Sequence, residues 1–186
     1  MKNIFKNTAV LLIISVVAFV ALAFVYELTK EPIALAEQKA KVEAYQTVYA
    51  EAKSFEAVDG SAATLTAFNA DCSDAQVAEV LAAVSADGKK MGYVFTVTAV
   101  GYGGEVKFAY GVDVTGTVVG YDVISHSETP GYGAKCTDGF VREQYPGVTS
   151  ADQVDGITGA TYTTDALKNS VQAAIDLTKQ LEGGAA

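Results

Sequence analysis

The sequence predicts an α+β fold, in which an antiparallel β-sheet has helices packed on one side and is tethered by one N-terminal transmembrane helix. Three observations lead to this prediction. An apolar run occupies the first 26 residues, short apolar segments separated by glycine-containing turns follow from residue 80 onward, and the chain ends in an amphipathic stretch. The 186 residues suffice for one ordinary domain besides the anchor.

The N-terminal apolar run is long enough to cross a membrane. Between Ala9 and Val25 it contains a single polar side chain, and we expect residues 4–26 to contact membrane lipid. A helix of about 20 residues, rising about 1.5 Å per residue, spans a hydrocarbon core of about 30 Å. Lys2 and Lys6 precede the run, and no excess of basic residues follows it. The positive-inside tendency therefore predicts a cell-membrane protein with a cytoplasmic N terminus and an extracytoplasmic body.

A cleaved signal peptide is the alternative to a retained anchor. Basic residues, an apolar core and the small-residue pattern Ala21-Leu22-Ala23 fit a processing site. The run continues through Phe24 and Val25, however, and exceeds the roughly 7–15 residues usual for a signal core. A retained anchor is therefore favoured, and both interpretations export the body.

Composition divides the chain into three parts: the N terminus with the transmembrane helix (1–30), a juxtamembrane helix (31–54) and an extracytoplasmic domain (55–186). Pro32 lies where a helix can begin, and residues 33–52 are rich in Ala, Glu, Gln and Lys without internal glycine or proline. The sequence leaves open whether this helix packs on the domain or a partner, or forms a solvated stalk.

The second half of the chain has the pattern of a β-meander followed by a helix. Asp87-Gly88 between two apolar runs is typical of a hairpin, and a second turn lies around Thr115-Gly116. Residues 55–79 carry no clear pattern, and a short helix is expected near 140–145. The predicted strands are 80–85, 91–100, 105–113 and 117–126.

The last helix is predicted by an apolar stripe at spacings of three and four residues, which Gly183-Gly184 ends. This spacing places the stripe on one face of the helix, and that face is expected to pack on the sheet. The residues of the stripe are Leu167, Val171, Ala174, Thr178 and Leu181.

Charge and composition exclude several functional classes. The chain has 13 basic and 22 acidic residues, so it lacks the positive surface that nucleic-acid binding requires. Two cysteines and one histidine are too few for a disulfide scaffold or a zinc centre.

The sequence does not decide whether Cys72 and Cys136 form a disulfide, because pairing depends on the distance between them. His126 invites a proton-transfer role, although a hydrogen-bonding loop residue is the simpler interpretation.

The loop before the last helix has the features of a phosphate site. Gly156 and Gly159 allow a ligand to approach the backbone, and the helix start offers N–H groups and the positive end of its dipole. No Gly-Lys-Ser/Thr sequence is present, so nucleotide hydrolysis by a P-loop finds no support. The alternative is that Asp155 or a threonine only caps the helix. The available hydroxyls are those of Thr158, Thr161, Thr163 and Thr164.

Three strings resemble one known family. Asp155-Gly-Ile-Thr-Gly-Ala-Thr161 is similar to the flavinylation motif of the bacterial covalent FMN-binding domain family. Ser125-His-Ser-Glu-Thr-Pro-Gly-Tyr-Gly-Ala-Lys135 resembles the His-x-Glu-Thr-Pro-Gly-x-Gly loop of its membrane redox subunits, and Gly101-Tyr-Gly-Gly104 matches a third stretch. The layout, with one anchor and the threonine motif near the carboxyl end, resembles the G-subunit family of Rnf complexes. The resemblance covers about residues 4–30 in layout and 80–180 in motif order.

The resemblance implies a set of cofactor-binding residues. Thr161 would carry FMN through a phosphoester bond, installed from FAD by a separate flavin transferase. The remaining residues would be read by the transferase (Asp155, Gly159, Ala160), hydrogen-bond the phosphate (Thr158, Thr163) or lie against the flavin ring or ribityl chain (Glu128, Thr129). Apart from the resemblance, Tyr102 and Tyr132 lie in glycine-rich loops, where exposed aromatic faces could stack on a flavin or line an electron path, although ordinary packing is the simpler interpretation of both.

The function that the resemblance implies is electron transfer within a membrane complex. The chain would be the covalent-FMN subunit of an Rnf-type ion-translocating ferredoxin:NAD⁺ oxidoreductase, with other subunits as partners and no turnover alone. It has no ferredoxin cluster motif and no dinucleotide fingerprint of its own. Two alternatives are an FMN subunit of another respiratory complex, such as the sodium-pumping NADH:quinone reductase, and a flavin-free membrane-anchored binding module.

Overall fold

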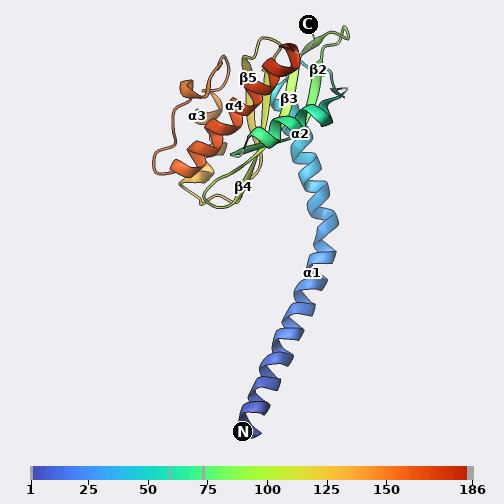
Figure 1. Ribbon diagram of the computed structural model, residues 1–186, viewed down its shortest axis with the longest axis vertical. Coiled ribbons are helices and arrows are strands. Elements are labelled where there is room, and N and C mark those ends of the chain that lie inside the picture. The colour runs from blue at the N-terminus through green and yellow to red at the C-terminus, as the bar shows by residue number, and fades with distance from the viewer. Residues whose placement is uncertain (1, 59, 73, 184–186) are drawn as a thin grey trace. The chain divides into compact units, whose positions relative to one another are not determined.

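A computed structural model describes residues 2–58, 60–72 and 74–183 (Figure 1). The chain divides into two compact units, Met1–Lys39 and Ala40–Ala186, so the predicted juxtamembrane segment is shared between them. The elements are α1 (Lys2–Val48), β1 (Ser54–Ala57), α2 (Ser61–Asp71), β2 (Ala75–Val84), β3 (Lys90–Val100), β4 (Glu105–Asp113), β5 (Val118–Ser125), the 3₁₀ helix η1 (Gly133–Thr137), α3 (Gly139–Arg142), the 3₁₀ helix η2 (Ala151–Gln153) and α4 (Thr161–Gly183).

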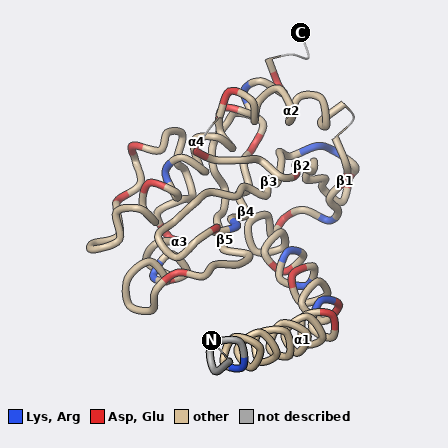
Figure 2. Tube along the Cα trace, turned by 60° about the horizontal axis from the view of Figure 1, so that its bottom comes forward, with Lys and Arg blue, Asp and Glu red and all other residues tan. Residues whose placement is uncertain are grey.

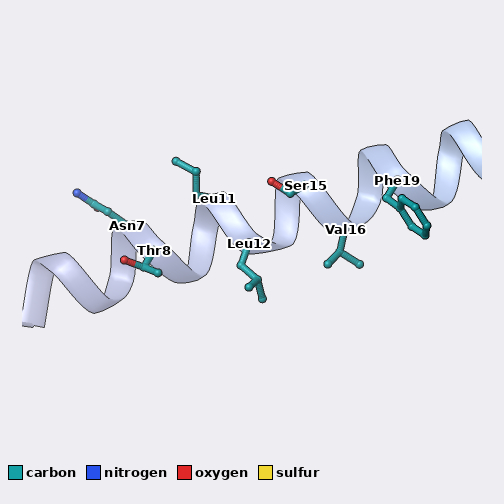
Figure 3. Close-up of a pocket in the computed structure, with 7 residues that line it drawn as sticks. All are labelled: Asn7, Thr8, Leu11, Leu12, Ser15, Val16 and Phe19. Atoms are coloured by element: carbon teal, nitrogen blue, oxygen red, sulfur yellow. The ribbon is translucent and has the colours of Figure 1, made fainter.

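Helix α1 is long and apolar enough to cross a membrane. Figure 3 shows part of it, where Leu11, Leu12, Val16 and Phe19 project from a single helix together with three small polar side chains. Pro32 lies inside α1, so the two predicted helices are one helix that ends at Val48. Proline removes only one backbone donor, and the strong helix formers that follow it continue the backbone hydrogen bonds of the helix.

The sheet has five strands in the order β1-β2-β3-β4-β5, and all neighbours are antiparallel. The four predicted strands correspond to β2–β5, except that β2 begins earlier, at Ala75. Gly88 has a φ of 74°, a left-handed conformation that supports the predicted Asp87-Gly88 turn. The antiparallel meander is therefore confirmed.

Strand β1, helix α2 and the two short 3₁₀ helices η1 and η2 were not predicted. Strand β1 has four residues, most of them exposed, and α2 buries only Phe68. Neither has a periodic apolar pattern, because each covers an edge or a corner of the sheet rather than its centre. Both lie within residues 55–79 or at their border, where the sequence showed no signal.

Helices cover both faces of the sheet, whereas the sequence predicts them on one side. Along β3, Phe95 and Val97 join the core under α2 and α4. Val94 points to the opposite face and packs against the end of α1. There the Tyr45 hydroxyl donates to Glu79 at 2.5 Å. The α+β class is confirmed, with residues 40–48 of α1 belonging to the domain.

The C-terminal helix is confirmed. Of its predicted stripe, Leu167, Val171, Ala174 and Thr178 are buried, and Leu181 is partly buried against the same core. The helix ends at Gly183, and Gly184 lies outside the described residues. The short helix expected near 140–145 is α3, which begins at Gly139.

Candidate functional site

The start of α4 closes a pocket of about 500 Å³, a size typical of small-molecule sites. Three segments far apart in sequence meet there: the hairpin between β3 and β4, the loop after β5 and the first turn of α4. The lining residues are Tyr102, Glu128, Thr129, Tyr132, Gly133, Gly159, Ala160, Thr161, Tyr162 and Thr163.

The first turn of α4 presents backbone donors to this pocket. The Ala160 carbonyl accepts the N–H of Thr164 at 2.9 Å, which is the first hydrogen bond of the helix. The N–H groups of residues 161–163 precede that bond and have no carbonyl partner within the helix. Gly159 has a φ of 82°, which turns the chain into the helix. The site therefore provides donors and a positive dipole end for an anion.

The hydroxyls of the motif have different roles. Thr163 is buried and donates to Glu128 at 2.9 Å. Thr164 accepts the N–H of Ile157 at 3.0 Å and donates to the Ala160 carbonyl at 2.9 Å. Thr158 is exposed and lies outside the pocket lining, whereas Thr161 is exposed and lines the pocket.

Glu128 connects the segments around the pocket. It is only 6% exposed, its Oε1 accepts the Gly103 N–H at 3.1 Å, and its Oε2 accepts the Thr163 hydroxyl. A Cβ atom at Gly101 or Gly133 would collide with this carboxylate, so a side chain at either position would displace Glu128 from its place in the structure. His126 Nδ1 accepts the Glu128 N–H at 3.2 Å, which is the role of a hydrogen-bonding loop residue.

Three tyrosines form the exposed rim of the pocket. Tyr102, Tyr132 and Tyr162 are 74%, 58% and 66% exposed. The rings of Tyr102 and Tyr162 are tilted with centroids 6.2 Å apart. Tyr102 and Tyr132 therefore lie at the exposed rim of the pocket and not in the hydrophobic core. Sequence reasoning missed Tyr162, although its place directly after Thr161 on a helix start is the signal that could have found it.

The pocket is acidic rather than basic. Glu128 is its only charged lining residue, and no lysine or arginine appears among the described residues that line it. Acidic positions are also spread along the loops and helices of the domain (Figure 2).

The two cysteines are not paired with each other. Burial, together with the Glu128 charge, raises the pKa of the Cys136 thiol to about 11. Cys136 and Cys72 are free thiols, so the disulfide left open by the sequence is not formed.

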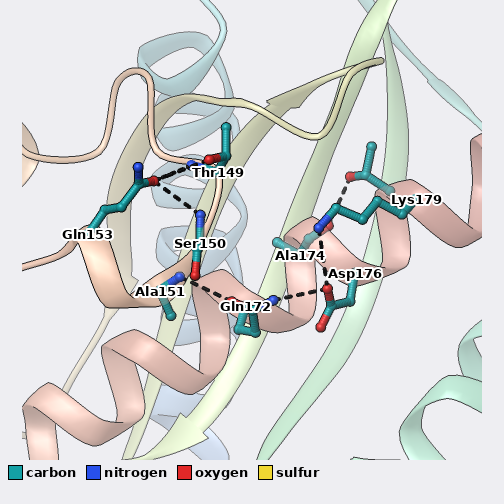
Figure 4. Close-up of polar contacts among 9 residues, drawn as sticks. Thr149, Ser150, Ala151, Gln153, Gln172, Ala174, Asp176 and Lys179 are labelled. Carbon is teal, nitrogen blue, oxygen red and sulfur yellow. Dashed lines mark hydrogen bonds and ion pairs between the residues drawn. The ribbon is translucent and has the colours of Figure 1, made fainter.

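Hydrogen bonds connect the loop at residues 149–153, which precedes the Asp155–Thr161 motif, to α4 (Figure 4). Gln153 Oε1 accepts the N–H groups of Thr149 and Ser150 at 2.7 and 3.2 Å. Gln172 on α4 accepts the Ala151 N–H at 3.0 Å and donates to Asp176 at 2.9 Å. These contacts fix the loop relative to the helix whose start forms the pocket.

Comparisons with known proteins find family matches in two parts of the chain. Residues 101–176 match the FMN-binding domain family, and residues 1–48 match the RnfG N-terminal region. A curated relative from Methanosarcina acetivorans, the G subunit of an ion-translocating oxidoreductase complex, is 30% identical over 98% of this chain and 98% of its own length. This chain belongs to the G-subunit family of ion-translocating oxidoreductase complexes.

Further relatives of this G-subunit chain carry related names. The G subunit of the Na(+)-translocating ferredoxin:NAD(+) oxidoreductase complex of Acetobacterium woodii is 28% identical over 97% of this chain and 94% of its own. Among solved structures, NqrC of Shewanella oneidensis has a TM-score of 0.47 and 21% identity, covering 56% of this chain and 60% of that chain. The family assignment rests on the sequence relatives.

The pocket of this G-subunit chain brings together most of the residues that the sequence predicts. Those inside it are Glu128, Thr129, Gly159, Ala160, Thr161 and Thr163. Asp155 and Thr158 are exposed on the loop outside the lining, and the Asp155 N–H donates to Gln144 at 2.8 Å. Because the Thr163 proton is engaged by Glu128, this hydroxyl has no proton left to donate to a phosphate.

Proposed function

We propose that this chain is the covalent-FMN electron-transfer subunit of a membrane-bound Rnf-type ion-translocating ferredoxin:NAD⁺ oxidoreductase complex. The FMN-binding domain match supports the cofactor. Relatives from Acetobacterium woodii and Clostridium ljungdahlii, named as Na(+)- and proton-translocating ferredoxin:NAD(+) oxidoreductase subunits, support the complex. With two cysteines the chain cannot hold a Cys₄ iron–sulfur cluster, so it relays electrons between other subunits.

Thr161 is the proposed attachment residue, and its position carries the proposal. It is the motif threonine that is both exposed and part of the pocket lining, whereas Thr163 and Thr164 are committed to internal hydrogen bonds. In the proposed transfer, Thr161 Oγ1 forms a bond to the FMN phosphorus of FAD. The FAD pyrophosphate bond breaks, AMP leaves, and the hydroxyl proton is released. A separate flavin transferase catalyses this step.

The chain's own groups fit FMN held at this place. Free N–H groups of residues 161–163 would donate to the phosphoester oxygens, since no basic side chain among the described lining residues is available to do so. Tyr102, Tyr132 and Tyr162 offer flat faces to an aromatic ring. Bound FMN supplies the electron-accepting and electron-donating chemistry, and the protein supplies position and electrostatics.

The membrane arrangement is part of the proposal. Residues 4–26 would contact lipid within segment 1–30, with the N terminus cytoplasmic and the domain 55–186 extracytoplasmic after the juxtamembrane segment 31–54. The apolar helix and the two lysines before it support this arrangement. An impermeant maleimide should label Cys72, which is partly exposed, in right-side-out vesicles. Labelling only after the vesicles are opened would contradict the orientation.

The decisive experiment is the intact mass of the full-length protein co-expressed with a flavin transferase. We expect the mass of FMN less one water, retained after denaturation and absent in Thr161→Ala. Thr158→Ala is the matched control, because Thr158 is an exposed threonine of the same loop outside the pocket. An increment that survives Thr161→Ala would refute the attachment site. No increment in the unmodified chain would favour the flavin-free binding module.

A further inference from the structure

Glu128 stands out because it is a buried carboxylate that has no cationic partner among the described residues. Its two oxygens accept from the Gly103 N–H and from the Thr163 hydroxyl, both uncharged donors. No ion pair of Glu128 is found in the part of the chain that the structure describes. A buried charge is costly unless it is hydrogen-bonded, so this side chain is held by the two donors alone.

The two donors lie on two different segments, and Glu128 accepts a hydrogen bond from each of them. Gly103 belongs to the β3–β4 hairpin, and Thr163 belongs to the first turn of α4. A carboxylate is an acceptor at both oxygens, so one side chain satisfies donors that approach from two segments. We infer that Glu128 is a positioning residue that fastens the hairpin to the start of α4 and thereby sets the width of the pocket.

The glycines around Glu128 support this inference independently. A Cβ atom at Gly101 would collide with Oε1, and one at Gly133 would collide with Oε2 and lie 2.6 Å from Thr163 Oγ1. Both glycine-rich strings of the sequence therefore make room for the same carboxylate. The surrounding backbone is shaped to receive Glu128 rather than to leave its oxygens free for a ligand.

The two segments that Glu128 connects carry two of the three tyrosines at the rim of the pocket. Tyr102 lies between Gly101 and Gly103 on the hairpin, and Tyr162 lies next to Thr163 on the helix. The 6.2 Å between their ring centroids is thus fixed through Glu128. Where the inference concerns a flavin it rests on the proposed function: the carboxylate would place negative charge beside the cofactor and oppose its reduction.

Two substitutions distinguish the effect of the length of the Glu128 side chain from the effect of its charge. Glu128→Asp keeps the charge but is shorter by one methylene, so it cannot span both donors. Glu128→Gln removes the charge and keeps the span, because its oxygen accepts the Gly103 N–H while its NH₂ donates to the Thr163 hydroxyl, which can also accept. Glu105→Gln is the control, since Glu105 is exposed on the same hairpin, outside the pocket lining.

The first measurement is amide hydrogen exchange at Gly103 in the full-length, flavin-free protein in detergent. A lost hydrogen bond to a charged acceptor should speed exchange by about tenfold or more in Glu128→Asp. Thr163→Val removes the other donor and should also speed exchange of the Thr164 N–H, the first hydrogen-bonded amide of α4. Glu128→Gln and Glu105→Gln should stay near the unmodified protein. Unchanged exchange in Glu128→Asp, or equal loosening in Glu128→Gln, would overturn the inference.

The second measurement is the flavin midpoint potential of the covalently loaded protein. Glu128→Gln should shift it to a more positive value, whereas Glu128→Asp and Glu105→Gln should not. An unshifted potential in Glu128→Gln would overturn the charge effect. Failure of the unmodified chain to take up flavin would count against the proposed function, and the exchange measurement would still decide the role of Glu128.

Discussion

Replacing Gly133 with alanine tests how tightly the pocket is built. The new Cβ would collide with Glu128 Oε2 and lie 2.6 Å from Thr163 Oγ1. Overpacking costs about 1–3 kcal/mol, and loss of the Thr163 hydrogen bond to a carboxylate costs about 1.5–3 kcal/mol. We therefore expect Gly133→Ala to lower the free energy of unfolding by about 2.5–6 kcal/mol, a large fraction of the stability of an ordinary domain.

The assay is urea unfolding of the full-length protein in detergent, followed by the near-ultraviolet circular dichroism of its ten tyrosines, since it has no tryptophan. Gly139→Ala is the control, because a Cβ there meets nothing within 4 Å and Gly139 lies in a helix. It should leave stability unchanged or raise it by up to about 1 kcal/mol. Equal stability of the two variants would refute the proposed packing around Glu128.

Three further predictions concern other contacts. Burial alone would raise the pKa of Glu79, but hydrogen bonds from Lys41 and Tyr45 and the Lys41 charge lower it below 4.5. This stabilisation is present above the unfolded-state pKa and is lost as pH falls through the lowered folded-state pKa. Glu79→Gln should therefore destabilise by about 1 kcal/mol or less at pH 7, and this difference in urea unfolding should shrink as the pH is lowered. Burial raises the pKa of both thiols, but Cys136 is fully buried whereas Cys72 is partly exposed, so maleimide should label Cys72 much faster, as peptide mass spectrometry can measure. Thr164→Val should lower the free energy of unfolding by about 1–2 kcal/mol, because it removes the hydroxyl that accepts from Ile157.

Local patterns were sufficient to predict the elements that carry them. The stripe of α4 and the turn at Gly88 depend on residues within one or two turns of each other, and both are confirmed. The anchor also follows from composition alone. Pro32 misled the prediction because a proline favours a helix start locally, whereas flanking helix formers decide whether the helix continues.

The role of Glu128 could not be predicted, because its partners lie far away along the chain. Gly103 and Thr163 are separated from it by 25 and 35 residues. A motif shows that a glutamate stands beside a Thr-Pro-Gly turn, but only the folded sheet shows that both oxygens are occupied. For the same reason the motif does not reveal that the Thr163 hydroxyl donates to Glu128 in the structure.

The acidic pocket gives the proposed covalent bond a physical purpose. A phosphate held without covalent attachment would gain no ion pair from the described lining residues and would lie in the same pocket as the Glu128 carboxylate. Backbone N–H groups at one helix start are worth about 1–2 kcal/mol to an anion, far less than the roughly 8 kcal/mol of micromolar binding. A phosphoester to Thr161 would remove the need for that affinity. The helix start then only has to orient the phosphate, and the carboxylate beside it can remain to shape the pocket.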